Sequence, residues 1–246
     1  MKRFNLFLLV TLLICVSCSS DRPAGKTEAE VLYKEALEMM KDGRHILATE
    51  RLNTLRSQYP YSFYATHAEL LQADILFEQE NYTESASAYI VFKDFHPKYQ
   101  QLNYVIWRIA ESFYNQLPGG FDKDLNSGTE AIKYYEELIR LFPSSEFVPV
   151  AREKIAHVKD LVNKREQYIA DFYFKTKVFD AARFRYLLIL NEFQDETLLQ
   201  HSMLRVVEAS YELGEKDQCL QYFQKYQDKF AASFLKQAEY VKERCQ

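Results

Sequence analysis

Apolar residues recur every three or four positions from Glu28 to the end of the chain, with polar residues between them. This is the spacing of an amphipathic helix, and no segment alternates apolar and polar residues in the way a half-buried strand does. Only 6 Gly and 6 Pro occur in 246 residues, few for a β-protein with many tight turns. The pattern therefore predicts an all-α fold.

A second pattern lies on top of the helical one, because small residues and prolines recur at intervals of 12. Five units follow it with decreasing regularity: Ala36, Ala48 and Pro60; Ala73, Ser85 and Pro97; Ala110, Ala131 and Pro143; Ala170, Ala182 and Gln194; Val207 and Cys219. This spacing resembles the tetratricopeptide repeat, a unit of helix, turn and helix. We expect a solenoid of about five such units, with a plain helical bundle as the alternative.

The small residues have a physical purpose in this scheme, since they let the two helices of a unit approach closely. Bulky residues one turn further on, such as Leu52, Tyr89 and Tyr135, fill the space between units. Proline then ends the second helix, because the residue before it is pushed out of the α region. The aromatic stretch YPYSFY at residues 59–64 is therefore expected at a corner between two units.

Two departures from the repeat are predicted to have structural consequences. The third unit carries extra residues in LPGGFDKDLNSG (117–128), expected as an exposed loop with turn signals at Gly119-Gly120 and Asn126-Ser127-Gly128. The helix from Pro149 to about Lys175 is too long for an ordinary repeat and would join the third and fourth units. A Ser144 or Ser145 cap is expected before it, and Ile155, Val158, Val162, Ile169 and Phe172 are expected along one face.

The N-terminus carries a different signal. A basic head, Lys2 and Arg3, precedes an apolar run from Phe4 to Val16, which is too short to span a bilayer as a helix and is typical of a secretory signal peptide. The small Ser17 before Cys18 resembles the bacterial lipoprotein signal. This implies cleavage before Cys18, a diacylglycerol on its sulfur and an acyl chain on its amine; ordinary cleavage with a free Cys18 is the alternative.

These signals divide the chain into four parts: a signal peptide (1–17), a lipidated N-terminus and flexible tether (18–27), repeats one to three (28–143), and repeats four and five with the long helix (144–246). Several acyl chains would anchor the protein durably. In the lipoprotein resemblance, Ser19 after the lipid cysteine implies transfer to the outer membrane, with the folded part facing the periplasm.

Composition and charge narrow the classes of function. Hydrophobic residues make up 48% of the chain, which excludes global disorder. The net charge is −4, and removing the signal peptide takes away the positive charges of Lys2 and Arg3. An acidic chain of this kind lacks the excess of basic residues typical of nucleic-acid binding. The five histidines are dispersed without metal-ligand spacing, and no nucleophile or phosphate-binding motif occurs. We therefore predict neither an enzyme nor a cofactor beyond the lipid.

Two cysteines lie near the C-terminus. Cys219 occupies a small-residue packing position, for which a buried thiol is the favoured interpretation. A Cys219–Cys245 disulfide is the alternative, because the periplasm is oxidising.

Taken together, the lipid cysteine, the tether, the five units and the chain length resemble the BamD family of lipoproteins, which belong to the β-barrel assembly machinery. The resemblance covers residues 18–230 and is carried by local stretches: QYPYSFY (58–64), HP (96–97) with NYV (103–105), FPSSEF (142–147), REQYIADFY (165–173) and AARFR (181–185).

The resemblance implies a two-ended adaptor. Its N-terminal repeats would receive the C-terminal signal of unfolded outer-membrane β-barrel proteins, in a groove for which we select Tyr61, Phe63, Tyr64 and Phe77. Core packing is the alternative role of each ring. Its C-terminal repeats would bind the BamA-type barrel-forming subunit through Arg185, with local ion pairing as the alternative. Accessory lipoproteins are further implied partners.

Two other functions remain open from the sequence. A repeat lipoprotein that assists pilus or secretin assembly is the second hypothesis. A periplasmic repeat protein of the Tol–Pal system is the third, which Cys18 and the lack of an N-terminal coiled coil disfavour. An enzyme is the least supported.

Overall fold

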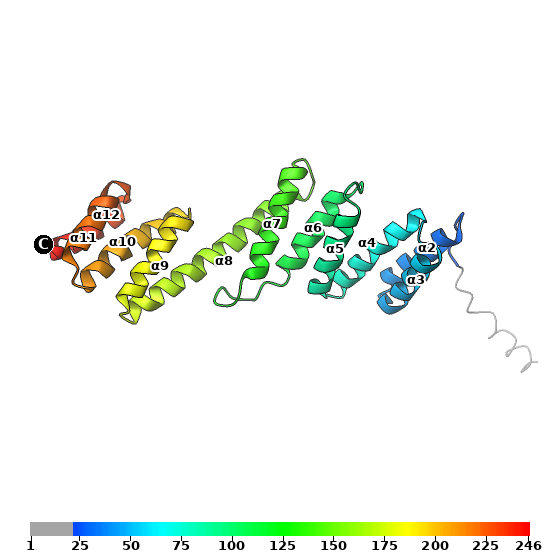
Figure 1. The fold of residues 1–246 in the computed structure, drawn as a ribbon, viewed down its shortest axis with the longest axis horizontal. Helices are drawn as coiled ribbons and strands as arrows, with labels where there is room; N and C mark the ends of the chain where they lie inside the picture. Colours follow the sequence, from blue (N-terminus) through cyan, green and yellow to red (C-terminus); the bar gives the residue numbers. More distant parts are fainter. Residues whose placement is uncertain (1–21) are drawn as a thin grey trace, which may run out of the picture. The chain divides into compact units, whose positions relative to one another are not determined.

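The computed structural model describes residues 22–246, and Cys18 with the predicted signal peptide lies outside the described residues. Within that range the chain forms eleven α-helices and one short 3₁₀ helix, and it contains no strand (Figure 1). The helices are α2 (Glu28–Lys41), α3 (His45–Gln58), α4 (Phe63–Glu78), α5 (Tyr82–Phe95), α6 (Leu102–Tyr114), α7 (Asn126–Leu141), α8 (Val148–Lys175), α9 (Phe179–Glu192), α10 (Glu196–Glu212), α11 (Lys216–Tyr226), η1 (Gln227–Lys229) and α12 (Ala232–Cys245). None of the described helices is both long and apolar enough to cross a membrane.

The helices pair in sequence order, α2 with α3, α4 with α5, α6 with α7, α8 with α9 and α10 with α11. Every small position of the 12-residue pattern is fully buried between these helices: Ala36, Ala48, Ala73, Ser85, Ala110, Ala131, Ala170, Ala182, Val207 and Cys219 are all 0% exposed. Helices α3, α5 and α7 each end two residues before a proline, at Pro60, Pro97 and Pro143. The prediction of an all-α fold of helix–turn–helix repeats is confirmed.

The turn inside a repeat has a common geometry that the repeat pattern did not indicate. Seven positions after the first small residue, the backbone turns left-handed at Gly43, Glu80, Lys177 and Gly214, with φ between 60° and 75°. The next residue donates its N–H to a carbonyl five positions earlier, as from Asn81 to Leu76 at 3.0 Å. This bond closes the last turn of the helix, so the left-handed residue is required even where it is not glycine.

The central repeats share a polar contact between their two helices. In each of these repeats, the residue that follows the first small position is acidic. A tyrosine, four residues after the second small position, donates its hydroxyl to that carboxylate. The pairs are Tyr89–Asp74 at 2.5 Å, Tyr135–Glu111 at 2.6 Å and Tyr186–Asp171 at 2.5 Å. Burial, together with the hydrogen bond to the carboxylate, raises the pKa of Tyr135 and of Tyr186. These tyrosines therefore remain protonated donors.

The long helix α8 is present, but two details of its prediction are wrong. Its N-cap is Phe147, which makes no side-chain cap bond, because Ser145 instead accepts the Phe147 N–H at 3.4 Å. Val158 is fully buried, whereas Phe172 is 53% exposed and does not belong to the packed face. Over 28 residues the packed face of a straight helix drifts, and α8 contacts three helices, α7, α9 and α10.

The segment 117–128 is only partly the exposed loop that the sequence predicts. Its last three residues already belong to α7, and Leu125 is 2% exposed. Phe121 lies edge-on to Tyr168 of α8, with ring centroids 5.8 Å apart. A Cβ on Gly128 would meet Val158 Cγ1 at 2.7 Å, so this glycine permits close packing of α7 on α8 rather than marking a turn.

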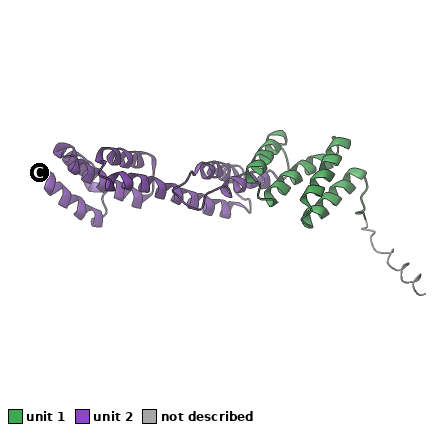
Figure 2. Ribbon diagram, turned by 90° about the horizontal axis from the view of Figure 1, so that it is seen from below, with its two compact units in different colours: residues 1–100 green, residues 101–246 purple. Residues whose placement is uncertain are grey.

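The chain divides into two compact units, one ending at Gln100 and one beginning at Gln101 (Figure 2). This division falls between the second and third repeats. The sequence analysis instead grouped repeats one to three (28–143) and repeats four and five (144–246), and that grouping stays a prediction. Because α8 packs against both α7 and α9, the third and fourth repeats lie in the same compact unit.

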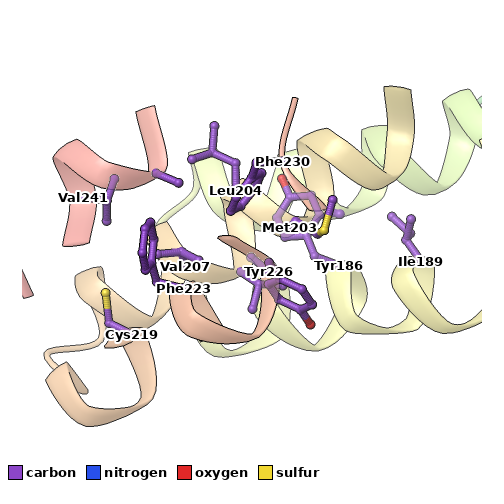
Figure 3. Close-up of a cluster of buried hydrophobic side chains, with 14 of the residues drawn as sticks. Tyr186, Ile189, Met203, Leu204, Val207, Cys219, Phe223, Tyr226, Phe230 and Val241 are labelled. Atoms are coloured by element: carbon purple, nitrogen blue, oxygen red, sulfur yellow. The ribbon is translucent and has the colours of Figure 1, made fainter. Parts of the chain in front are cut away.

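The core of the second unit contains the disulfide that the sequence left as the lesser alternative. Cys219 and Cys245 are joined, with Cα atoms 6.3 Å apart, so the preferred free thiol is wrong although the predicted burial is confirmed. Cys219 lies among Val207, Phe223 and Val241 (Figure 3). The repeat thus uses one of its small packing positions for a covalent link.

Candidate interaction surfaces

The corner between α3 and α4 presents the predicted client-binding aromatics with unequal exposure. Tyr61 is 101% exposed and Phe63 is 70% exposed. Tyr64 is half-buried, with its ring 5.6 Å from that of Tyr33 on α2. The corner therefore combines two solvent-facing rings with one that packs against the first repeat.

Phe77 does not join this group. It lies fourteen residues after Phe63 on α4, about 20 Å further along the helix axis. Its ring packs edge-on against Tyr82 at 5.3 Å, at the turn into α5. Phe63 and Phe77 therefore lie at opposite ends of one helix and do not form one compact cluster, and the client-binding role of the four aromatics stays a prediction.

The corner aromatics extend into a cluster that includes residues the sequence prediction missed. The His67 ring lies 4.1 Å from Phe63, 6.0 Å from Tyr33 and 5.9 Å from Tyr99, measured between centroids. Burial raises the pKa of Tyr33 to about 12. The spacing of Phe63 and His67 by four residues was the available signal, since such residues are neighbours on a helix.

A separate groove of about 610 Å³ opens between α3, α4 and α5. Its apolar wall is formed by Leu76, Val91, Phe92 and Phe95, of which Val91 and Phe95 are 53% and 77% exposed. Its polar edge is formed by Arg56, Glu69, Gln72 and His96. The first unit thus contains one concave site with both an apolar and a charged side.

The polar edge of this groove is an ordered set of hydrogen bonds. Arg56 donates to Gln72 Oε1 at 2.8 Å and to Glu69 Oε1 at 3.0 Å. His96 Nε2 lies 2.8 Å from the other oxygen of Glu69. The guanidinium is held in place by two acceptors while its side chain stays 42% exposed, so it remains within reach of a bound anion.

In the second unit, Arg185 lies on α9 with its side chain 39% exposed. Its nearest acidic partner is Glu166 of α8, at 4.0 Å, the limit of an ion pair. Neighbouring Arg183 behaves differently, because it donates to Glu215 at 2.5 Å and Ser210 at 3.1 Å. Arg183 therefore ties α9 to the following repeat, whereas Arg185 is partly exposed and has one long ion pair within its own repeat.

Large apolar side chains are exposed on α9, which carries Arg185, and on α8, which packs against it. Phe184 is 61% exposed on α9, and Tyr168 and Phe172 are each 53% exposed on α8. Arginine and exposed aromatic side chains on the same pair of helices are the composition typical of a protein interface.

The family model that matches this chain is that of the outer membrane lipoprotein YfiO, over residues 25–225. The chain belongs to the YfiO family of outer membrane lipoproteins. The match includes both described surfaces, the groove around Arg56 and the helices around Arg185.

Curated relatives of this family agree in length and name. The chain is 26% identical to the outer membrane protein assembly factor BamD of Rickettsia prowazekii, over 87% of this chain and 86% of the relative. It is 23% identical to BamD of Pasteurella multocida, over 86% and 84%, and 22% identical to BamD of Vibrio cholerae, over 88% and 94%.

Solved structures show only slight likeness in shape. The TPR2AB domain of yeast Sti1, solved in a complex with pHSP90, has a TM-score of 0.46 and 12% identity, covering 90% of this chain and 99% of that one. PilF of Pseudomonas aeruginosa has a TM-score of 0.41 and 14% identity, covering 86% and 81%. Likenesses of this size support no functional inference.

For this YfiO-family chain, the described residues contain no cluster of three or more His, Cys, Asp or Glu side chains able to hold a metal ion. The most buried carboxylate, Glu111, accepts from Tyr135 and from Lys154 Nζ at 2.5 Å. Its partners lie on α7 and α8, so its role in the fold is to join three helices.

Proposed function

We propose that this chain is an outer-membrane protein assembly factor of the BamD type, a non-catalytic adaptor anchored by lipid and facing the periplasm. The family match over residues 25–225 carries the proposal, and the names of the full-length relatives give its content. In this proposal one surface binds unfolded β-barrel clients and another binds the BamA-type barrel-forming subunit.

Cys18 is the proposed anchor. The small residue followed by cysteine, after a short apolar run, is the observation that motivates it. Intact-mass analysis of the mature protein should find an acylated N-terminal cysteine, and Cys18→Ala should leave the membrane fraction. An unmodified Cys18 thiol in the wild-type protein would contradict this assignment.

The groove between α3, α4 and α5 is the proposed client site, in place of the four aromatics selected from sequence. An extended peptide with an aromatic end could place its ring against Val91 and Phe95 and its carboxylate near Arg56. Both chemical features are available within one concavity of suitable size.

The client site is tested by Phe95→Ser, which removes an exposed ring with little effect on the core. We expect weaker binding of a synthetic peptide that carries a barrel protein's C-terminal sequence, measured by fluorescence anisotropy. Tyr61→Ser, at the aromatic corner, is the matched control and should bind like the wild type. Loss of binding in Tyr61→Ser alone would show that clients bind at the aromatic corner and not in the groove.

Arg185 is the proposed contact with the barrel-forming subunit. Its partly exposed guanidinium has only a long local ion pair, to Glu166 at 4.0 Å, and the same two helices carry exposed rings, so a carboxylate of another protein could pair with it. Arg185→Glu would set like charges together and leave a carboxylate unpaired. We expect at least a ~10-fold loss of barrel-subunit recovery in affinity purification, with unchanged helicity.

Arg152→Glu provides the control for this experiment. Arg152 is exposed on α8, near the N-terminal end of that helix, whereas Arg185 of α9 faces Glu166 further along α8. It should retain wild-type recovery. Wild-type recovery with Arg185→Glu would refute the contact, and unfolding of that variant would assign the residue a structural role. Identifying the co-purifying barrel protein also separates this function from secretin assembly, in which a secretin would be recovered instead.

A further inference from the structure

Helix α12 follows the fifth repeat and is held by few side chains. Only Ala238, Val241 and Cys245 of its fourteen residues are buried. Its N-cap, Ala231, makes no side-chain cap bond. Its other non-covalent contacts lie at its edges: Phe234 and Leu235 pack partly buried against the core, and the Ala231 N–H donates to Gln200 Oε1 at 2.9 Å. Arg244 donates to the Tyr211 hydroxyl at 2.8 Å, and Lys242 lies over the Phe223 ring at 4.9 Å.

The disulfide joins this sparsely held helix to the best-packed part of the second unit. Cys219 is 0% exposed on α11, in the small-residue position of the repeat, and Cys245 is 1% exposed at the last residue of α12. Their Cα separation of 6.3 Å lies within the usual range for a disulfide. The link spans 26 positions and so encloses all of α12.

We propose that the Cys219–Cys245 disulfide is a clasp that keeps α12 docked, and that reduction releases α12 while the five repeats stay folded. One observation supports a local effect. Tyr186, Ile189 and Leu204 lie on α9 and α10 (Figure 3), which pack directly against each other, whereas α12 adds only Ala238, Val241 and Cys245 to the same buried cluster.

The clasp also decides whether a pocket exists at this end of the second unit. A pocket of about 520 Å³ has Phe174, Arg205 and Tyr211 on one side and Tyr240 and Arg244 of α12 on the other. Arg244 lies 4.4 Å from the Tyr211 ring centroid and 5.8 Å from that of Tyr240. Undocking α12 would remove this second side, so the pocket would be complete only in the oxidised protein.

The chemistry requires a co-reactant of one class, a disulfide-bearing thiol oxidase. The Cys219 thiolate attacks the oxidase disulfide and one oxidase thiolate leaves. The Cys245 thiolate then displaces the second oxidase sulfur from the mixed disulfide. One S–S bond forms in this chain and one breaks in the oxidase, which takes up two electrons and two protons. Closure of the clasp is therefore tied to arrival in an oxidising compartment.

Hydrogen–deuterium exchange read by mass spectrometry tests the clasp on the full chain, purified from membranes in mild detergent without reductant. Amides of residues 233–245 should exchange at least ~10-fold faster after reduction by a phosphine, while amides of α9 and α10 keep their protection. Peptides from α4 and α5, in the other compact unit, serve as the internal control.

Cys245→Ala separates the bond from the packing, because Cys219 then remains in its buried position. This variant should exchange like the reduced wild type and should not respond to reductant. The proposal is overturned if α12 stays equally protected in the reduced protein, or if two thiols are alkylated in the denatured, unreduced protein. It is also overturned if reduction exposes α9 and α10 together with α12, because the bond would then hold the whole unit.

Discussion

The central repeats and the terminal repeats share one backbone frame but hold it together differently. In the second, third and fourth repeats a buried tyrosine donates to a carboxylate across the helix pair. In the first repeat the same two positions are Leu37 and Leu52, and the contact is apolar. In the fifth they are Glu208 and Phe223, and a disulfide lies one turn before Phe223.

The difference shows that the small-residue spacing and the polar pairs do separate work. Small residues set how closely two helices approach, and this is common to all five repeats. A hydroxyl–carboxylate pair is directional, so it fixes how one helix is placed along the other, whereas an apolar contact tolerates sliding. The first and fifth repeats do without this pair.

In the third and fourth repeats, a basic side chain from the first helix of the next repeat also contacts the carboxylate. Lys154 of α8 binds Glu111, and His201 of α10 lies 2.8 Å from Asp171. The carboxylate therefore joins three helices in both cases, across a repeat boundary. The two bridges differ in how they respond to pH and to mutation, which makes them testable.

The largest expected effect comes from Lys154→Met, which leaves Glu111 buried with only the Tyr135 hydroxyl. We expect a loss of about 3 kcal/mol in the free energy of unfolding, because a buried carboxylate loses its counter-charge. Denaturant unfolding measures it. Adding Glu111→Gln to the same chain should recover part of the loss, since the uncompensated charge is then gone.

Lys164→Met is the matched control on the same helix. Lys164 pairs with Asp160 at 2.6 Å, but both side chains are more than half exposed. A surface pair of this kind contributes less than about 0.5 kcal/mol. Equal effects of Lys154→Met and Lys164→Met would show that burial of the bridge does not matter.

A smaller effect, dependent on pH, is expected for Asp171→Asn. Burial by itself would raise the pKa of the Asp171 carboxyl, but hydrogen bonds from His201 and Tyr186 outweigh it and hold the pKa below its ordinary value. A lowered carboxyl pKa stabilises the fold above the unfolded-state pKa, and this stabilisation is lost as pH falls through the folded-state value.

The variant should therefore be less stable than wild type by about 1–2 kcal/mol at pH 7, and the gap should narrow below about pH 4. Arg205 also faces Asp171, so the comparison is made at fixed ionic strength. Thermal melts across pH 3–7 provide the measurement. A gap that stays constant over this range would mean that the charge of Asp171 does not contribute.

The smallest expected effect comes from giving the fifth repeat a tyrosine, as Phe223→Tyr. The new hydroxyl would lie in the position of Tyr186, and Glu208 already occupies the carboxylate position, where it accepts from Arg205 at 2.8 Å. We expect a change within about 1 kcal/mol, because the hydroxyl gains an acceptor. Phe230→Tyr, a buried ring without such an acceptor, should be clearly more destabilising.

The arrangement of helix pairs was predictable from sequence, because it depends on small side chains that recur at regular intervals. Residues such as Ala48 and Ala182 are recognisable one by one, and their spacing gave the helix pairs, the ends at proline and the long helix α8. The carboxylate–tyrosine pairs also occupy regular positions in the repeats, for example Glu111 and Tyr135. They went unrecognised because nothing in one repeat alone shows that the two side chains meet.

The candidate site was less predictable, for a geometric reason. The sequence placed Tyr61 and Phe63 at a proline corner but left open whether their rings pack in the core or face solvent, and the structure shows them exposed. The groove at Arg56 and Phe95 was not predicted, since it combines side chains from three helices with the orientation of a guanidinium held by Glu69 and Gln72. Phe77 was grouped with the corner by composition, although the helix rise separates them.

The sequence by itself determined the helical class, the phase of the repeats and the burial of every small position, because these follow from periodicity along one chain. Only the tertiary structure decided that Cys219 is bonded to Cys245, that Gly128 serves close packing, and that Glu80 and Lys177 adopt left-handed turns. Each of these depends on a distance or a backbone angle set by neighbouring helices, and such quantities have no local signature in the order of residues.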